Sequence, residues 1–199
     1  MAKLLIASAN PGKQREIRAL LDFPDLILVD LKMIGVRHHV EENGVSYADN
    51  AHLKASVFAH ISGMWALSDD SGLEVDALNG APGPRSARLG EPGFSDADRR
   101  QFLLNMLRSL PQPWTARFRC VAALSCPEGE VDLAEGICPG EVIHSERGTG
   151  GFGFDPIFLV HGTNQTMAEL SLEEKNRISH RARAIKALTP ILKQRLGLS

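Results

Sequence analysis

The alternation of apolar and polar positions predicts strands and helices in turn along the first half of the chain. Residues 3–7 form a short apolar run typical of a buried strand, and turn residues at 10–12 separate it from an amphipathic helix. A second strand is predicted at 26–30. A longer helix is predicted at 46–61, because a Ser46…Asp49 capping pair opens it and a glycine at 63 stands where a helix ends.

The second half of the chain continues this mixed pattern. A compact strand at 65–68 leads into Asp69-Asp70-Ser71-Gly72, where the glycine predicts a turn, and a half-exposed extended segment is predicted beyond it at 73–77. Residues 80–93 are rich in glycine and proline and are predicted to form a loop. Periodicity and capping residues predict the remaining elements: a helix starting at 95, a hairpin of strands 118–125 and 131–137, a strand at 156–160, and helices at 171–178 and 182–196.

These elements predict a single domain, residues 1–199, of the α/β class. No repeat, low-complexity tract or linker interrupts the chain, and 199 residues is close to the usual size of one domain. Apolar residues make up 43% and charged residues 23%, the proportions of a globular protein that buries an ordinary core. Strands that alternate with helices favour one mixed α/β unit.

Charge and cysteine usage exclude several kinds of partner. A net charge of -2 supplies no broad positive field for polymeric nucleic acid or an anionic membrane. Three cysteines without CxxC spacing indicate reduced thiols in a cytosolic protein rather than a disulfide framework or a zinc site. No apolar run approaches the roughly 20 residues of a membrane span, and no signal peptide is recognisable, so a cytoplasmic location is predicted.

The first candidate for chemistry is the segment Ser8-Ala-Asn-Pro-Gly-Lys13. A strand that turns into a helix presents free backbone N–H groups and the positive end of the helix dipole, and a lysine adds a formal charge for phosphate. The segment is not a Walker A loop, because the required earlier glycine and the Ser or Thr after the lysine are missing. A plain strand-to-helix turn with an exposed lysine is the alternative.

The second candidate is the pair Asp69-Asp70. Carboxylates at the end of a buried strand can hold a hard cation such as Mg²⁺ and accept a proton from water. Adjacent residues on an extended backbone face opposite ways, so only one of the pair is expected to reach a given site. Glu41 or Glu42 is a candidate for a further oxygen ligand, and a solvated acidic turn is the alternative.

The third candidate is the glycine-rich segment 148–156, Gly-Thr-Gly-Gly-Phe-Gly-Phe-Asp-Pro. It matches G-x-G-x-x-G literally, but that fingerprint must lie between a strand and a helix, and here it precedes a strand, so dinucleotide binding is rejected. Phe152 and Phe154 in a flexible loop favour stacking against a flat ligand. The alternative is that both phenylalanines belong to the core.

The fourth candidate is the basic run that ends in Lys175, His180 and Arg181. In one continuous helix these three side chains would point in different directions, so a break at Ser179 is needed to bring them round one ligand. Lys54 is a further possible phosphate contact. A solvated basic helix surface is the alternative for each. The adjacent His38 and His39 are assigned to a polar loop rather than to a zinc site.

Five segments taken together resemble the inosine triphosphate pyrophosphatase family. That family comprises Mg²⁺-dependent enzymes that convert non-standard purine nucleoside triphosphates to monophosphates, and its members are usually homodimers with a long central mixed sheet dividing two α/β lobes around an active cleft. The segments occur in the family's order: Ser8-Ala-Asn-Pro-Gly-Lys13, Asp69-Asp-Ser-Gly-Leu73, Gly80-Ala-Pro-Gly83 with Ser86-Ala-Arg88, the run 148–156, and Ser179-His-Arg181.

The resemblance implies a role for each matching residue. Asp70 is the implied proton acceptor and a metal ligand, and the implied second ligand is Glu41 or Glu42. The implied triphosphate and base contacts are Ser8, Asn10, Lys13, Lys54, Ser71, Phe152, Gly153, Phe154, Asp155, Lys175, His180 and Arg181.

Two departures from the family pattern stand out. Phe154 replaces a frequent tyrosine, so a hydroxyl hydrogen bond is lost while stacking is kept, and Pro84-Arg85 replaces Ile-Tyr in a loop whose shape is therefore expected to differ.

The resulting hypothesis is hydrolysis of ITP, dITP or XTP between the α and β phosphates. Lys13, Lys54 and Lys175 would stabilise the phosphate charge, and His180 and Arg181 would donate hydrogen bonds to a 6-oxo purine. Two alternatives stay open: a sensor that binds nucleotide without turnover, and a pyrophosphatase for another modified base.

Overall fold

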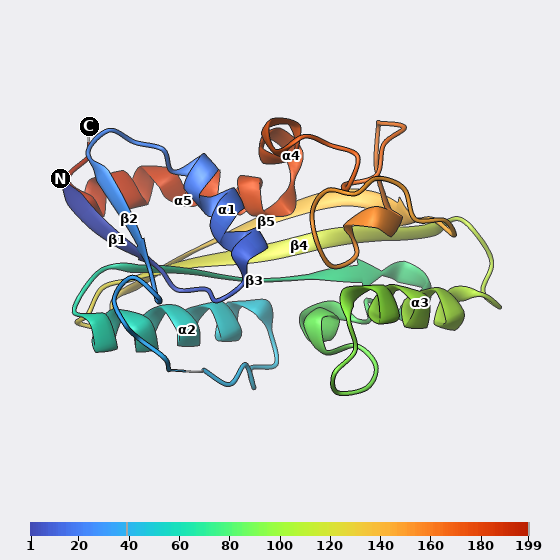
Figure 1. The fold of residues 1–199 in the computed structure, drawn as a ribbon, viewed down its shortest axis with the longest axis horizontal. Helices are drawn as coiled ribbons and strands as arrows, with labels where there is room; N and C mark the ends of the chain where they lie inside the picture. Colours follow the sequence, from blue (N-terminus) through green and yellow to red (C-terminus); the bar gives the residue numbers. More distant parts are fainter. Residues whose placement is uncertain (39, 199) are drawn as a thin grey trace. The chain divides into compact units, whose positions relative to one another are not determined.

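The computed structural model describes residues 1–38 and 40–198 and contains one six-stranded sheet with the order β2-β1-β3-β4-β5-β6 (Figure 1). Strand β1 pairs in parallel with β2 and β3, whereas β5 and β6 are antiparallel, so the sheet is mixed. The predicted α/β class is therefore confirmed. The strands are β1 (Ala2–Ile6), β2 (Leu26–Asp30), β3 (Ala66–Val75), β4 (Trp114–Ser125), β5 (Val131–Val142) and β6 (Phe158–Val160).

Five α-helices accompany the sheet among the residues that the structure describes. They are α1 (Pro11–Leu20), α2 (Tyr47–Ser62), α3 (Asp96–Leu107), α4 (Leu172–Ile178) and α5 (His180–Leu196). The chain divides into two compact units, which we call unit 1 and unit 2. Unit 1 comprises Met1–Asp70, Cys120–Gly136 and the chain from His180 onward, and unit 2 comprises Ser71–Arg119 and Ile137–Ser179. Strands β3, β4 and β5 each contribute residues to both units.

Unit 1 buries both faces of its part of the sheet. Along β1, Leu4 and Ile6 join a cluster with α1 and α5, while Leu5 joins a second cluster that includes Phe58 of α2. This alternation follows from the two-residue repeat of a strand, and Figure 1 shows α1 and α5 on one face with α2 on the other. A strand covered on both faces needs apolar residues at every position, which explains the continuous apolar run at the start of the sequence.

Unit 2 has its own apolar core. Leu103 and Leu107 of α3 pack into a cluster with Trp114 and Phe118 of β4 and Phe158 of β6. The rings of Phe118 and Phe158 lie with their centroids 4.4 Å apart. Each unit therefore contains a separate set of buried side chains.

Several helix boundaries agree with the sequence prediction. Ser46 forms the predicted capping box with Asp49, and Gly63 ends α2 in the left-handed conformation with φ 66°. The predicted break at Ser179 is confirmed, because this residue is extended (ψ 158°) and ends α4, while α5 begins at His180, two residues earlier than predicted.

Strand β3 corrects the prediction of a turn at 69–72. The strand runs without interruption from Ala66 to Val75, and Leu73 and Val75 are completely buried rather than half-exposed. Burial of these two apolar side chains outweighs the turn preference of the Asp-Asp-Ser-Gly sequence. The acidic pair therefore lies in the middle of a strand instead of at its end.

Two further segments differ from the prediction or fall outside it. Part of the predicted loop, including Pro84 and Arg85, forms a 3₁₀ helix (Gly83–Arg88). His39 lies outside the described residues, so of the two adjacent histidines only His38 is described. None of the helices in the described part of the chain is long and apolar enough to cross a membrane.

The continuity of β3 predicts the cost of truncating Leu73. Leu73→Ala removes a completely buried side chain and is expected to lower the free energy of unfolding by about 2–5 kcal/mol. Urea denaturation of wild type and variant measures this difference. The control is Leu133→Ala on β5. Leu133 is 46% exposed, so its truncation is expected to change the free energy of unfolding very little. A loss at Leu73 no larger than that at Leu133 would contradict the buried strand.

Candidate active site

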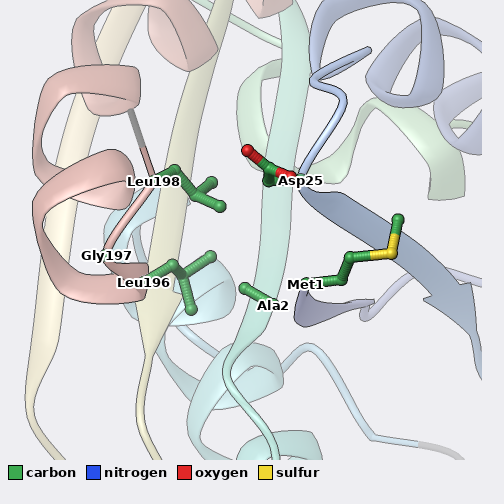
Figure 2. A pocket seen from close by; sticks show the side chains of 6 residues that line it. All are labelled: Met1, Ala2, Asp25, Leu196, Gly197 and Leu198. Carbon is green, nitrogen blue, oxygen red and sulfur yellow. The ribbon is translucent and has the colours of Figure 1, made fainter.

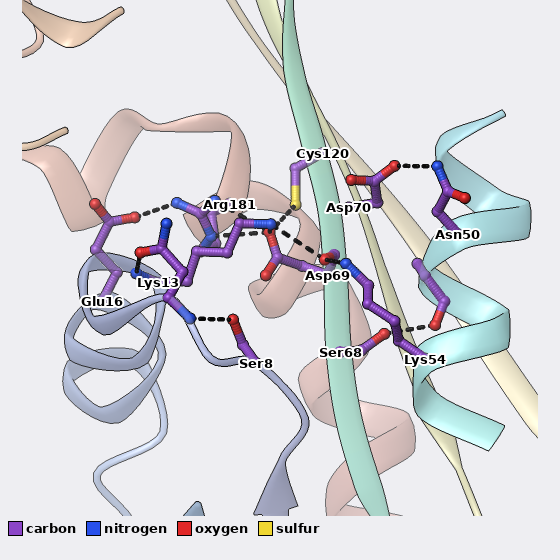
Figure 3. A network of polar contacts seen from close by, with 12 residues as sticks. Ser8, Lys13, Glu16, Asn50, Lys54, Ser68, Asp69, Asp70, Cys120 and Arg181 are labelled. Atoms are coloured by element: carbon purple, nitrogen blue, oxygen red, sulfur yellow. Dashed lines mark hydrogen bonds and ion pairs between the residues drawn. The ribbon is translucent and has the colours of Figure 1, made fainter. Parts of the chain in front are cut away.

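The acidic pair of β3 sends its two carboxylates in opposite directions. Asp69 points toward α1 and the start of α5, and Asp70 points toward α2 (Figure 3). Successive side chains of a strand alternate between faces, so this is the expected arrangement for neighbours in mid-strand. Both side chains are almost completely buried, with Asp69 1% and Asp70 4% exposed. The opposite directions expected for the pair are therefore observed, and which of the two carboxylates reaches a substrate stays a prediction.

Asp69 lies at the centre of a cluster of cations. Its Oδ2 accepts hydrogen bonds from Nε and Nη2 of Arg181 at 3.1 and 3.0 Å and forms an ion pair with Nζ of Lys13 at 3.1 Å. Arg181 also pairs with Glu16 of α1. Burial raises the pKa of Asp69, but the charges of Arg181, Lys13 and Lys54 outweigh burial and hold this pKa far below its usual range. Asp69 is therefore ionised.

The segment before α1 is held by local hydrogen bonds that orient the helix start. The side chain of Asn10 caps α1 by accepting the N–H of Lys13 at 3.0 Å, and the hydroxyl of Ser8 accepts the N–H of Asn10 at 3.3 Å. Lys13 reaches from this first turn to β3, where its Nζ also donates to the carbonyl of Asp69 at 3.2 Å. The predicted phosphate cradle thus lies beside the acidic pair.

Asp70 belongs to a second group of contacts, on the α2 side. Its Oδ2 accepts a hydrogen bond from Nδ2 of Asn50 at 2.9 Å. Burial raises the pKa of Asp70 above its usual value, and the nearby cations Lys54 and Lys13 offset only part of this effect, while the negative charge of Glu42 adds to it. Asp70 is thus the carboxylate of the pair that gains most from a nearby cation or a proton.

The structure separates the two candidate glutamates. Glu42 binds Nζ of Lys54 through its Oε1 at 2.6 Å, and the same Nζ donates to the carbonyl of Asp69 at 2.7 Å. Glu41 instead accepts a hydrogen bond from the exposed side-chain amide of Asn43 at 2.9 Å. Glu42 rather than Glu41 therefore belongs to the group of contacts around Asp70.

The residues around Asp70 suit a magnesium ion. No cluster of three His, Cys, Asp or Glu side chains placed to hold a metal occurs among residues 1–38 and 40–198. Mg²⁺ does not need one, because it commonly binds one or two carboxylates and completes its octahedron with water and substrate phosphates. Asp70 and Glu42 provide that donor set, since both are carboxylates and the negative charge of Glu42 acts on Asp70.

Unit 2 contains another group of predicted site residues. Nζ of Lys175 pairs with Oδ2 of Asp155 at 2.6 Å and lies 5.1 Å from the ring centroid of Phe152, and the same Oδ2 accepts the N–H of Phe152 at 2.9 Å. Asp155 therefore holds the loop and the lysine together. The ring of Phe154 packs into the core of unit 2, and the N–H of Gly153 binds Asp96 at 2.8 Å, so nucleotide contacts by these two residues stay predictions.

The other predicted substrate contacts, Ser71, His180 and Arg181, lie on β3 and α5. Ser71 follows Asp70 on β3 and is partly exposed, and His180 and Arg181 form the first turn of α5, where both are buried. Lys175 belongs to unit 2, whereas His180 and Arg181 belong to unit 1, so their convergence on one ligand stays a prediction.

Sequence reasoning missed two residues of this site, Glu16 and Asn50. Glu16 stands three residues after Lys13 on α1, and Asn50 stands four residues before Lys54 on α2. Residues with these spacings share one face of a helix. The signal was therefore present: a polar residue that shares a face with a candidate phosphate-binding lysine.

A surface pocket elsewhere in unit 1 contains none of the predicted site residues. This pocket of about 440 Å³ lies beside the N-terminus and the end of α5 (Figure 2). Asp25 is its one charged side chain, and the other lining residues are Met1, Ala2, Leu196, Gly197 and Leu198. Its lining therefore offers a single carboxylate and no lysine, arginine or histidine side chain for a phosphate.

A family model shows which class of protein this fold and site define. The model described as the Ham1 family matches residues 4–191, and the chain belongs to that family. This confirms the resemblance to the inosine triphosphate pyrophosphatase family that the motifs predict.

Individual relatives match over nearly their whole length. The dITP/XTP pyrophosphatase of Desulforamulus reducens is 47% identical to this chain, and the match covers 96% of this chain and 95% of the relative. The dITP/XTP pyrophosphatase of Geobacter sulfurreducens is 46% identical, and the match covers 99% of this chain and 98% of the relative. Among solved structures, a HAM1 protein from Coxiella burnetii superposes with a TM-score of 0.88 at 36% identity and covers 98% of this chain and all of its own. A nucleoside-triphosphatase / dITP/XTP pyrophosphatase from Mycobacterium abscessus superposes with a TM-score of 0.75 at 41% identity. The match covers 94% of this chain and 99% of that structure.

The buried cluster around Asp69 predicts a large stability cost for loss of Arg181. Arg181→Met leaves Glu16 and Asp69 buried without the cation they share, and we expect the free energy of unfolding to fall by about 3–5 kcal/mol. Urea denaturation at neutral pH measures the change. The matched control is Arg177→Met, which breaks an exposed pair with Glu173 and is expected to change stability very little. Equal losses in the two variants would contradict a structural role for the buried cluster.

Proposed function

We propose that this chain is a dITP/XTP pyrophosphatase. It hydrolyses dITP, XTP and ITP between the α and β phosphates and releases the monophosphate and pyrophosphate. Full-length similarity to relatives of that name supports this function. The observation that carries it in the structure is that Lys13 and Lys54 both converge on β3 where Asp70 stands. A site with two lysines beside a buried carboxylate suits a triphosphate and the water that attacks it.

The lysines bind the triphosphate. Nζ of Lys13 and Nζ of Lys54 each donate to the carbonyl of Asp69, so both positive charges are held close to one point of the backbone. Preorganised cations stabilise the charge that moves onto the leaving pyrophosphate in the transition state. Ser8 and Asn10 shape the start of α1, whose first N–H groups add partial positive charge.

Asp70 acts on the attacking water, and with Glu42 it holds Mg²⁺. A bound Mg²⁺ supplies charge neutralisation for the phosphates. Burial disfavours the ionised form of Asp70, which makes its carboxylate a better proton acceptor than an exposed aspartate. Glu42 also accepts a hydrogen bond from Lys54 and so links the metal ligands to the phosphate-binding lysines.

The purine base is assigned to Phe152 for stacking and to His180 and Arg181 for hydrogen bonds, whereas Lys175 is assigned to the triphosphate charge. A 6-oxo purine accepts hydrogen bonds that adenine cannot accept, which favours inosine and xanthosine over adenosine. Arg181 uses three of its donors on Asp69 and Glu16, and its contact with the base stays a prediction. A homodimer and a cytoplasmic location stay further predictions.

Product analysis tests this function directly. We incubate the purified protein with Mg²⁺ and ITP, dITP, XTP, GTP or ATP, and separate pyrophosphate from orthophosphate by ion-exchange chromatography. The expected products are monophosphate and pyrophosphate, formed mainly from ITP, dITP and XTP. Asp70→Asn is the negative control, which is expected to bind nucleotide and to lose turnover by a factor of about 10²–10⁴.

Four results would contradict the proposal. Release of orthophosphate would show cleavage at another bond. Binding of nucleotides without turnover would favour a sensor, and turnover of only another modified nucleotide would favour a different substrate. Near-normal turnover by Asp70→Asn would contradict the role of Asp70 as the group that acts on water.

The two adjacent glutamates offer a matched test of the metal site. Glu42→Gln is expected to raise the Mg²⁺ concentration for half-maximal activity about tenfold or more, because it removes a charged ligand, while Glu41→Gln is expected to leave it unchanged. Isothermal titration of Mg²⁺ into the nucleotide-free proteins supplies a second measurement. Equal Mg²⁺ affinities in the two variants would contradict the assignment of Glu42.

A further inference from the structure

Asn50 carries a completely buried amide that makes two directed hydrogen bonds. Its Nδ2 donates to Oδ2 of Asp70 at 2.9 Å, and its Oδ1 accepts the backbone N–H of Gly44 at 2.8 Å (Figure 3 shows the first). Gly44 offers only a donor in this contact, so the oxygen of the amide must face Gly44 and its NH₂ group must face Asp70. The partners thus determine the orientation of the amide.

An asparagine is an unfavourable choice for this position on physical grounds. It lies inside α2, where asparagine is a poorer helix former than alanine, and an amide costs free energy on burial unless it is hydrogen-bonded. The neighbouring inward-facing residues Ala51 and Ala55 are small, apolar and completely buried. Helix propensity alone would favour a further alanine at position 50, whereas the two hydrogen bonds of the amide require asparagine.

Gly44 allows the backbone to approach this amide closely. A Cβ at position 44 would lie 2.7 Å from Oδ1 of Asn50 and 2.6 Å from Cβ of Asp49, which is too close for either. Gly44 stands two residues after Glu42, so its bond to Asn50 fastens the acidic loop to α2. One helical turn further along α2, Lys54 binds Glu42 itself at 2.6 Å.

We propose that Asn50 is a positioning residue for the proposed pyrophosphatase reaction: its amide holds the carboxylate of Asp70 and, through Gly44, the loop that carries Glu42, in a fixed relation to each other. The inference rests on the proposed function. Fixing one oxygen of Asp70 sets the direction in which the carboxylate meets water and the cation. Small displacements of a reacting group can cost about 10²-fold in rate, so such a restraint matters for turnover.

Ser68 provides the matched comparison. It lies on β3 two residues before Asp70, it is completely buried, and its hydroxyl donates to the carbonyl of Ala51 on α2. Ser68 and Asn50 therefore both link α2 to β3 through a buried hydrogen bond. Only the bond of Asn50 ends on a carboxylate of the proposed site.

The test compares Asn50→Ala with Ser68→Ala. For each protein we measure kcat and KM with dITP and Mg²⁺, the affinity for an α,β-methylene analogue of dITP by calorimetry, and the thermal melting temperature. Asn50→Ala is expected to lower kcat about 10–100-fold and to keep KM and analogue affinity within about threefold. Ser68→Ala is expected to have a lower melting temperature than the wild type and an unchanged kcat. Equal kcat values for the two variants would overturn the positioning role.

Gly44→Ala provides a second route to the same conclusion, including the case in which Asn50→Ala does not fold. The added Cβ pushes the backbone away from Oδ1 of Asn50 without touching Asp70, so a smaller fall in kcat at constant KM is expected. Wild-type kcat in a folded Gly44→Ala would overturn the link through Gly44. Where both variants fold, the double variant Gly44→Ala/Asn50→Ala is expected to have the same kcat as Asn50→Ala alone. Additive reductions of kcat would show that the two residues act independently, which would contradict action through one amide.

The wild-type chain in the same assay separates this inference from the function on which it rests. Failure of the wild type to release pyrophosphate from dITP contradicts the proposed function. Wild-type turnover together with an unimpaired Asn50→Ala contradicts only the positioning role of Asn50.

Discussion

The negative charge of Asp69 in the interior of unit 1 constrains everything around it. A carboxylate that is 1% exposed requires cations, and Arg181, Lys13 and Lys54 supply them from α5, α1 and α2. Each of these side chains must leave its own helix and reach β3, which determines how the three helices pack against the sheet in this unit. Breaking such a buried arrangement costs more than an exposed ion pair contributes, so the packing and the charge balance are inseparable.

Side chains alternate between the two faces of a strand, so the neighbouring residues Asp69 and Asp70 lie in different environments and can have different roles. Asp69 faces cations that keep its pKa low, whereas Asp70 faces Asn50 and a site in which burial raises its pKa. Two carboxylates in different environments can therefore serve as a structural anion and as a proton acceptor within one strand. Lys13 and Lys54 connect the two groups, since each contacts Asp69 and each also acts electrostatically on Asp70.

Local sequence signals predicted much of the fold, and long-range contacts account for what they missed. The helix at 46–61 and the break at Ser179 follow from capping chemistry, which depends on residues within one turn. The turn predicted at 69–72 is wrong because burial of Leu73, an effect of distant partners, overrides local preference. In the same way, Asp70 was predicted from its motif, but Glu42 was separated from Glu41 only by its contact with Lys54. Asn50 acquires its role only from a carboxylate 20 residues away.

The ion pairs of Arg181 bear on the order in which the chain matures during synthesis. Arg181 follows Asp69 by 112 residues and Glu16 by 165, so both acids leave the ribosome long before their guanidinium does. Until α5 is translated, unit 1 has two acidic groups to bury and lacks the cation that they share. The nascent chain therefore cannot complete this core early, and acquisition of the native unit is delayed until α5 docks.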